Sequence, residues 1–133
     1  MAYSKQTWDT TSYVNPTRMN HIEDGIYASS LSETVSNVAF TSIVDSTSNF
    51  VCRRMGDLVV LNISTLIFNT TPSNTDKIIT GLPTPRNQIS VSLNDYNDGS
   101  TKRVRVTDTW LQNLYSDLQT GHNYFGTIIY FAY

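Results

Sequence analysis

The fold is decided by residues 51–68, which read Val-Cys-Arg-Arg-Met-Gly-Asp-Leu-Val-Val-Leu-Asn-Ile-Ser-Thr-Leu-Ile-Phe. On both sides of Gly56-Asp57, side chains of one kind recur at every second position. A period of two puts alternate side chains on the same face of a strand, and Gly-Asp between two such runs is typical of a tight turn. The stretch therefore predicts a β-hairpin, with Cys52 as a small buried apolar residue.

Downstream of this hairpin, residues 69–76 read Asn-Thr-Thr-Pro-Ser-Asn-Thr-Asp. All of these residues interrupt regular structure, so they predict an exposed loop that is a candidate tip. Residues 77–80 predict a short strand, which Gly-Leu-Pro-Thr-Pro at 81–85 brings to an end.

A second hairpin is predicted between residues 88 and 106. The first run alternates apolar and polar residues, and the second places Val104 and Val106 inward. The polar segment 94–100 between them ends in Asp98-Gly99, which is typical of a turn.

The last two runs complete the strand pattern. Residues 110–115 are ambiguous, but the surrounding period favours a strand. Residues 124–133 are apolar on both faces, and such a strand is either central in a sheet or lies in a subunit interface. One face carries Phe125, Ile129 and Phe131, and the other carries Ile128, Tyr130 and Ala132. Several short strands with no helices between them predict an antiparallel β-sandwich of jelly-roll type.

The N-terminal part differs, because residues 15–26 predict a helix. Asn15 can cap its first turn and Pro16 suits its first position. Three apolar residues, spaced by three and four positions, then form a seam along one side: Met19, Ile22 and Ile26.

A single helix of this length is marginal in water, so the seam must be covered. Either the chain's own sandwich or the same helix of sister chains can cover the seam. Ile at successive seam positions favours a bundle of three or four helices. The helix is expected to end near Leu31. The predicted division is an attachment segment and trimerisation helix at 1–38 and a β-sandwich head at 39–133. Residues 2–14 are expected to dock their aromatic side chains on another protein.

Composition narrows the classes of partner. Only 15% of the residues are charged, below the typical ~25%, and the net charge is -2. This balance favours neither nucleic acid nor membrane as a partner. The single cysteine excludes an intrachain disulfide and suits synthesis in a reducing cytoplasm. The N-terminus shows no signal peptide. Release by cell lysis, as part of a virion, would reconcile that origin with a surface suited to glycans.

Several motifs resemble one known group of proteins. Trp8, followed by Asn-Pro-Thr-Arg-Met-Asn-His-Ile-Glu-Asp-Gly-Ile at 15–26, resembles the entry segment of small tail-fibre, baseplate and head-fibre proteins of phages of Gram-positive bacteria. Four features of the second half look like their terminal β-domains: the segments 53–61, 79–86 and 121–130, and a strand pair around Asp98-Gly99. The chain departs from that pattern at Asp108-Thr109-Trp110, where such proteins often have Gly.

The resemblance implies a homotrimer whose N-terminal end joins another virion protein and whose β-head points outward. Such heads bind host cell-wall saccharides or strengthen the particle.

Candidate sites follow from side-chain chemistry. His21 and His122 are far apart in sequence and belong to no catalytic or metal-binding motif, so no catalytic residue, metal or cofactor is predicted. A saccharide site needs an aromatic face and planar polar groups. Two clusters offer both. One is the loop from Asn94 to Asp98, in which Asp95, Tyr96 and Asn97 are the expected ligand contacts. The other comprises Trp110, Tyr115 and His122. Each is also explained by ordinary structure, as a solvated hairpin tip or as core packing.

The sequence thus predicts a non-enzymatic, homotrimeric virion fibre or receptor-binding protein whose β-head binds host-surface glycan. Three other functions stay open: a decoration or connector protein of the virion without a ligand, a small depolymerase of wall glycan, and a free-standing carbohydrate-binding module.

Overall fold

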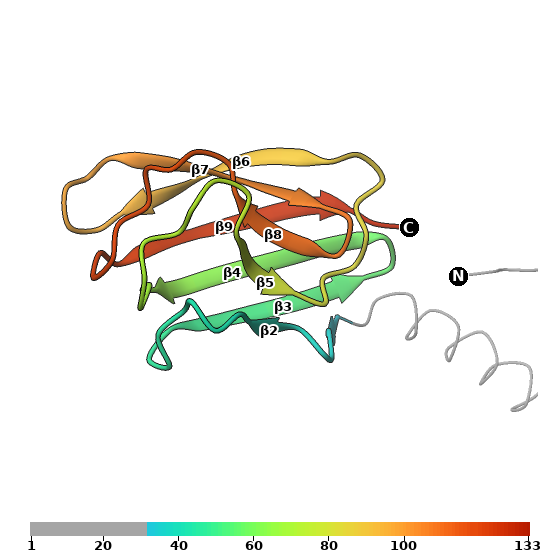
Figure 1. Ribbon diagram of the computed structural model, residues 1–133. Coiled ribbons are helices and arrows are strands. Elements are labelled where there is room, and N and C mark those ends of the chain that lie inside the picture. Colours follow the sequence, from blue (N-terminus) through green and yellow to red (C-terminus); the bar gives the residue numbers. More distant parts are fainter. Residues whose placement is uncertain (1–31) are drawn as a thin grey trace, which may run out of the picture. The chain divides into compact units, whose positions relative to one another are not determined.

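The computed structural model describes residues 32–133 (Figure 1). The predicted helix and its seam of Met19, Ile22 and Ile26 lie outside the described residues. Glu33–Tyr133 forms one compact unit, which begins ahead of the head domain predicted from residue 39. Within residues 32–133, no helix is long and apolar enough to span a membrane.

Nine strands make up this unit. They are β1 (Glu33–Thr34), β2 (Ala39–Phe40), β3 (Asn49–Met55), β4 (Leu58–Leu66), β5 (Lys77–Thr80), β6 (Ile89–Asp95), β7 (Thr101–Thr107), β8 (Trp110–Asn113) and β9 (Tyr124–Phe131).

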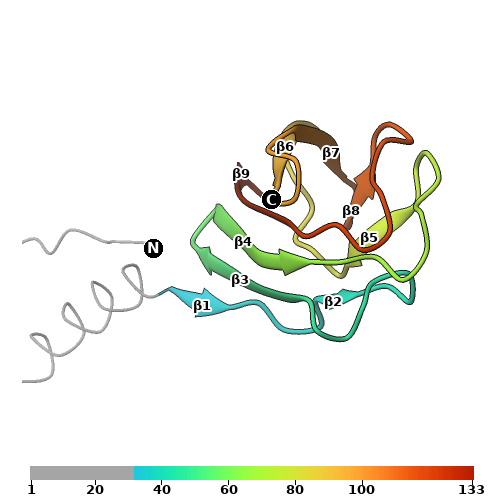
Figure 2. The same ribbon diagram turned by 90° about the vertical axis from the view of Figure 1, so that its left-hand side faces the viewer.

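The strands form a single antiparallel sheet in the order β1-β3-β4-β9-β6-β7-β8-β5-β2. The predicted mostly β, antiparallel architecture is confirmed. In place of the two separate sheets of a sandwich, however, hydrogen bonds run from one strand to the next without a break. The sheet curls on itself, as the end view in Figure 2 shows. Periodicity identifies which face of a strand is buried but not its neighbours, so it could not distinguish a curled sheet from two stacked ones.

Both predicted hairpins are present. β3 pairs with β4 across Gly56-Asp57, with Met55 opposite Leu58. Gly56 has a φ of 59°, a left-handed conformation that glycine adopts without strain. β6 pairs with β7 across the polar segment, with Asn94 opposite Thr101.

The core lies on the inner face of the curl. Alternate residues of β4, β7 and β9 point inward, as the period of two predicts, and the inward residues are almost fully buried: Val59, Leu61, Ile63, Val104, Val106, Ile128 and Tyr130. Cys52 is buried as predicted, with 2% of its surface exposed. β9 is the fourth of nine strands, so the strand that is apolar on both faces is central.

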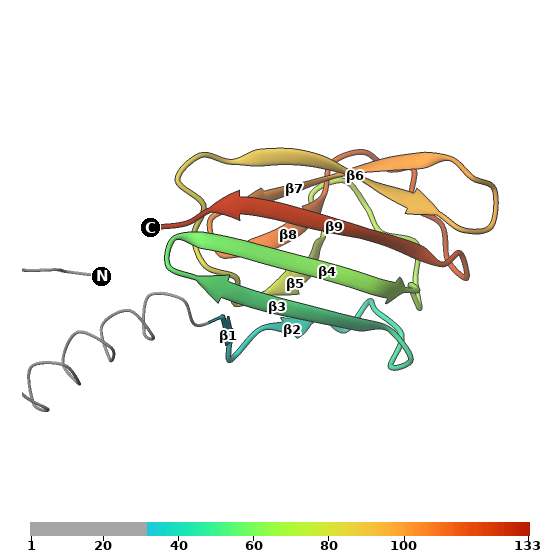
Figure 3. The same cartoon turned by 180° about the vertical axis from the view of Figure 1, so that it is seen from behind.

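Aromatic packing brings the two ends of the sheet together, and a close backbone approach joins the residue after β5 to the segment before β2. β2 lies beside β3 in all three ribbon views (Figures 1, 2 and 3). Phe40 of β2 and Phe50 of β3 pack edge to face, with ring centroids 4.9 Å apart. Gly81, directly after β5, approaches the backbone of Asn37, where a Cβ would lie 2.1 Å from the carbonyl oxygen. Only glycine fits this contact.

The β7–β8 turn contains the predicted departure from the phage proteins, at Asp108-Thr109-Trp110. Asp108 takes the left-handed conformation, with a φ of 52°. Asp tolerates this region better than most residues do. Thr107 pairs directly with Trp110, so the ladder continues regularly without a glycine.

We predict that Gly81→Ala destabilises the fold far more than Gly56→Ala. Both glycines have positive φ, which costs a non-glycine residue about 1 kcal/mol. Gly56 has no atom within 4 Å of an added Cβ, whereas Gly81 would overlap the Asn37 backbone. Urea unfolding should show a loss of about 1 kcal/mol for Gly56→Ala and about 3 kcal/mol or more for Gly81→Ala. Equal losses would show that the close approach of Gly81 to the Asn37 backbone does not constrain the fold.

We also predict that stability falls as the pH rises above about 10. Burial raises the pKa of Tyr130 and of Tyr124 above their usual value of 10.0. The folded state therefore favours the neutral phenols. The two phenols contribute fully to the free energy of unfolding below the pKa of tyrosine in the unfolded chain. This contribution is lost as the pH rises from that value toward the higher pKa of the folded chain.

Tyr130→Phe tests this dependence by urea unfolding between pH 8 and 11. The variant loses the hydrogen bond that the Tyr130 hydroxyl donates to the Pro83 carbonyl at 2.7 Å, which should cost about 1 kcal/mol at pH 8. Its stability should nevertheless fall less steeply at high pH than that of the parent chain. Tyr133→Phe, at an exposed position, is the control and should keep the parent slope. If the stability of Tyr130→Phe fell with pH as steeply as that of the parent chain, Tyr130 would not be a cause of the loss of stability at high pH.

Candidate functional site

The β6–β7 turn is organised around Asp95, the last residue of β6. Its carboxylate Oδ1 accepts a hydrogen bond from the Asn97 backbone N–H at 2.8 Å. Its backbone N–H donates to Ser100 at 2.8 Å, and its carbonyl accepts from Gly99 at 2.9 Å. These bonds hold residues 95–100 in a defined loop, and only 1% of the Asp95 surface is exposed.

A second loop, residues 121–123, is bonded to the first. The Tyr96 backbone N–H donates to the Asn123 carbonyl at 2.8 Å. In return, the Asn123 backbone N–H donates to the Asn97 side-chain oxygen at 2.9 Å. Figure 1 shows the β6–β7 loop and the loop before β9 at the same end of the molecule. The two loops therefore form one surface.

His122 completes this surface. Its Nδ1 lies 2.7 Å from Asp95 Oδ2, and its ring stacks over Tyr124 with centroids 6.3 Å apart. A hydrogen bond to an ionised carboxylate requires Nδ1 as the donor, and Nε2 takes no part in this contact. About a quarter of the His122 side chain is exposed, whereas none of the Asp95 side chain is. The buried carboxylate thus orients an exposed imidazole.

Asp98 is the exposed acid of the same turn. Hydrogen bonds from the Ser100 hydroxyl, at 2.6 Å, and from the Ser100 backbone N–H, at 2.8 Å, lower the pKa of Asp98. One donor atom each of Asp95, Asp98 and His122 lie within 4.8 Å of one another, a spacing that a cation could use. The hydrogen bonds within the loops already account for this arrangement, and three donors are fewer than Ca²⁺ or a structural Zn²⁺ takes.

The chemistry of this surface suits binding. Tyr96 has 76% of its surface exposed, which leaves its ring free to stack on the apolar C–H face of a sugar. Asp98, Asn97 and Nε2 of His122 surround it with hydrogen-bonding groups for hydroxyls. We call the surface formed by Asp95, Tyr96, Asn97, Asp98 and His122 the loop site.

The structure therefore brings together four of the six predicted saccharide residues, namely Asp95, Tyr96, Asn97 and His122. The sequence had grouped His122 with Trp110 and Tyr115 instead. Their separation in sequence concealed the pairing, because His122 and Asp95 are 27 residues apart and meet only through the β6–β9 contact.

Trp110 lies at the other end of β7. It pairs with Thr107, whereas the turn that carries the loop site leads into Thr101. The six steps of ~3.3 Å from Thr101 to Thr107 separate the two ends of β7 by about 20 Å. The Trp110 Nε1–H donates to Gln112 at 2.7 Å, and the Lys77 ammonium lies 3.9 Å from the ring centroid. Trp110 is thus already engaged on its ring and at its nitrogen.

Tyr115 lies in the connection between β8 and β9, with 57% of its surface exposed. The structure records no hydrogen bond from its side chain among the described residues. The Tyr115 ring is exposed, as the Tyr96 ring is. Among residues 32–133, however, no hydrogen bond or aromatic contact joins it to Trp110 or His122, its partners in the predicted cluster.

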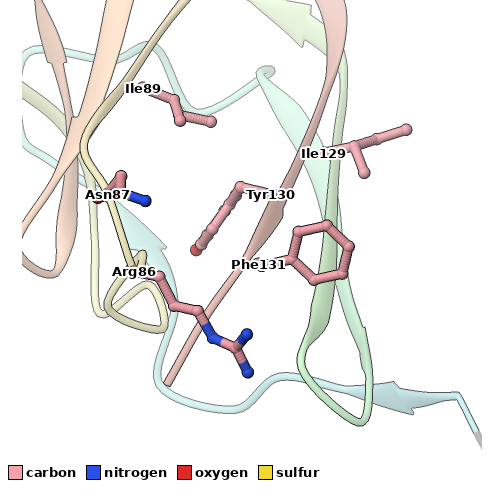
Figure 4. Close-up of a pocket in the computed structure, with 6 residues that line it drawn as sticks. All are labelled: Arg86, Asn87, Ile89, Ile129, Tyr130 and Phe131. Atoms are coloured by element: carbon pink, nitrogen blue, oxygen red, sulfur yellow. The ribbon is translucent and has the colours of Figure 1, made fainter.

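A hollow of about 420 Å³ is a second concave feature, which sequence reasoning missed. β6 and β9 pair only at Asn94 and Asp95 and then diverge, which opens the hollow between them. Figure 4 shows Tyr130 facing Arg86 and Asn87, with Ile129 and Phe131 on the other side of β9. Arg86 donates to the Ala132 carbonyl at 3.2 Å and pairs with Asp57. The one signal in the sequence that could have indicated the hollow was Pro85-Arg86-Asn87, where the run that ends the strand at 77–80 gives way to polar residues.

We predict that Asp95 holds the loop site together. Asp95→Ala removes the acceptor of the Asn97 backbone N–H and the partner of His122 Nδ1, and so breaks a contact within the β6–β7 turn and a contact that joins the two loops. Urea unfolding should show a loss of about 2 kcal/mol or more. Asp98→Ala, at an exposed position in the same turn, is the matched control and should lose clearly less stability. Equal losses in the two variants would contradict a structural role for the buried carboxylate.

No model of a protein family and no curated protein sequence matches this chain. A solved structure does match: the crystal structure of the head domain of phage bIL170, reported in connection with a common fold for the receptor-binding domains of lactococcal phages. The TM-score is 0.53 and the sequence identity is 14%, and the match covers 74% of this chain and 96% of the phage domain. The fold implied by the resemblance in the sequence is thus confirmed: the described part of the chain has a fold similar to that of a phage head domain.

Proposed function

We propose that this chain is a virion receptor-binding protein of a phage that infects Gram-positive bacteria, and that it binds host-surface glycan through its β-head without catalysis. The observation that carries the proposal is the fold similarity to the bIL170 head domain, of which 96% is covered. The fold alone does not specify a ligand, so the argument for a ligand rests on the loop site.

Two properties of the loop site support glycan binding. The first is an exposed aromatic ring, Tyr96, beside uncharged and charged hydrogen-bonding groups. The second is rigidity, since the two loops are joined by the Asp95–His122 contact and by the bonds between Asn123 and residues 96 and 97. A preordered loop loses little conformational entropy when a ligand binds.

The same arrangement supports a role without catalysis. A glycosidase places two carboxyl groups across a cleft, one of them with a raised pKa. Here the Asp95 carboxylate is bonded within the loops, and hydrogen bonds lower the pKa of Asp98. Neither acid is arranged as a proton donor.

Assembly supplies the affinity in this proposal. The seam of Met19, Ile22 and Ile26 joins three copies, and the residues ahead of it attach to another virion protein. Three weak saccharide sites on one spike, and many spikes on one particle, then bind by avidity.

Two measurements test assembly and the absence of catalysis. Light scattering of the full chain should give three times the chain mass of 15.0 kDa. Wall polysaccharide that is incubated with the protein should keep its chain length. A monomer would favour a free-standing module, and shortened polysaccharide would favour a depolymerase.

We predict that Tyr96→Ala weakens binding to Gram-positive cells at least tenfold. The lost stacking contact is worth about 1 kcal/mol at each site, and three sites multiply the effect. The measurement is the binding of fluorescently labelled full-length protein to a panel of Gram-positive strains and to their isolated wall polysaccharide. Folding of the variant is checked by its unfolding midpoint.

Tyr133→Ala is the matched control, because Tyr133 is 77% exposed and Tyr96 is 76% exposed. It should bind as the parent does. Loss of binding in Tyr133→Ala with normal binding in Tyr96→Ala would place the ligand away from the loop site. A parent protein that binds no strain would favour a decoration protein of the virion.

A further inference from the structure

The outer face of β3, β4 and β9 carries a continuous apolar surface. The register places Met55, Leu58 and Phe131 side by side in one row across the three strands. The next row on this face places Val60 beside Ile129. Met55 is 44% exposed, Ile129 59% and Phe131 61%. We call Met55, Leu58, Val60, Ile129 and Phe131 the apolar face.

The same sheet provides an internal comparison. On the outer face of β6 and β7, the register pairs Ser90 with Arg105, Ser92 with Arg103 and Asn94 with Thr101. All of these side chains are polar. The inner faces of both strand groups contribute to the buried core, with Leu61 and Ile63 on β4 and Leu93 and Val104 on β6 and β7. The apolar outer face of β3, β4 and β9 is therefore not a general property of this sheet.

This difference has a physical meaning. A sheet face that remains in water normally carries polar side chains, because exposed apolar surface gains nothing from folding. A contiguous exposed apolar surface on a folded protein marks a place where another surface packs. The apolar face covers the second to the fourth of the nine strands, and its most exposed side chains, Ile129 and Phe131, lie on β9, which has a neighbouring strand on each side.

The start of the described chain lies on the same ladder. Thr34 of β1 is opposite Arg53, Arg53 is opposite Val60, and Val60 is opposite Ile129. Three strand spacings of ~4.8 Å place Thr34 about 15 Å from Ile129. The described part of the chain therefore begins on the strand ladder that carries the apolar face.

We propose that the apolar face packs against the same face of two further copies of this chain, so that β9 lies against the axis of the trimer. The inference rests on the homotrimer proposed above. An N-terminal contact that gathers three copies would bring their apolar faces together at a high effective concentration. In a closed trimer, each copy presents the same surface to the axis.

The surroundings of the apolar face fit this occupant. Arg53 borders it on β3, and the Arg86–Asp57 ion pair borders it beside Phe131. A buried apolar centre with a polar rim of both charges is the usual anatomy of a subunit interface. The loop site lies beyond the other end of β9, next to Tyr124, and so stays open to a ligand.

Cysteine variants of the full chain test the inference. Ile129→Cys places a thiol in the apolar face, and Ser92→Cys places one on the polar outer face of β6 as the control. Cys52 is 2% exposed, so the parent chain gives the background. Three quantities are measured: the mass by light scattering, the rate of labelling by a maleimide dye, and covalent linking by a short bismaleimide on a denaturing gel.

The expected result is a trimer in which Ile129→Cys is labelled at least tenfold more slowly than Ser92→Cys and is linked into covalent dimers. Equal labelling rates in a trimer would overturn the inference but not the proposed function. Slow labelling without covalent dimers would also overturn it, because residues 1–31 of the same chain would then cover the apolar face. A monomer with equal rates would overturn both proposals.

Discussion

The structure depends on the pairing of β9 with two hairpins at once. β9 pairs with β4 from Leu58–Phe131 to Leu66–Tyr124, and with β6 at Asn94–Phe125 and Asp95–Tyr124. Without β9, the β3–β4 hairpin and the β6–β7 hairpin share no strand pairing. The C-terminal strand therefore converts two local units into one sheet, and its inward residues Ile128 and Tyr130 lie where the two halves meet.

The short contact between β6 and β9 also positions the loop site and the hollow. It ends at Asp95, so the residues that precede β9 lie directly against the β6–β7 turn, and His122 meets the buried carboxylate. Away from that contact the two strands diverge and leave the hollow beside Arg86. The short pairing of β6 with β9 therefore explains both features. The loop site forms at the end where the two strands pair, and the hollow forms where they separate.

Local features of the fold could be predicted from the sequence, because they depend on neighbours along the chain. The period of two and the Gly56-Asp57 turn define one hairpin, and the polar segment before Thr101 defines the other. The order of the strands could not be predicted, because alternation says which side of a strand is buried and not which strand lies beside it. The same limit explains why His122 was grouped with Trp110.

β9 shows both the value and the limit of the sequence pattern. Its two apolar faces left two explanations open, a central strand or a subunit interface. Its place in the sheet establishes the first, yet a central position accounts only for the inward side chains. Phe125, Ile129 and Phe131 remain between 39% and 61% exposed, while the outer face of β6 and β7 is polar. Burial within residues 32–133 therefore accounts for one face of β9, which closes the core. The exposed apolar side chains of the other face are the observation on which the proposed packing between copies rests.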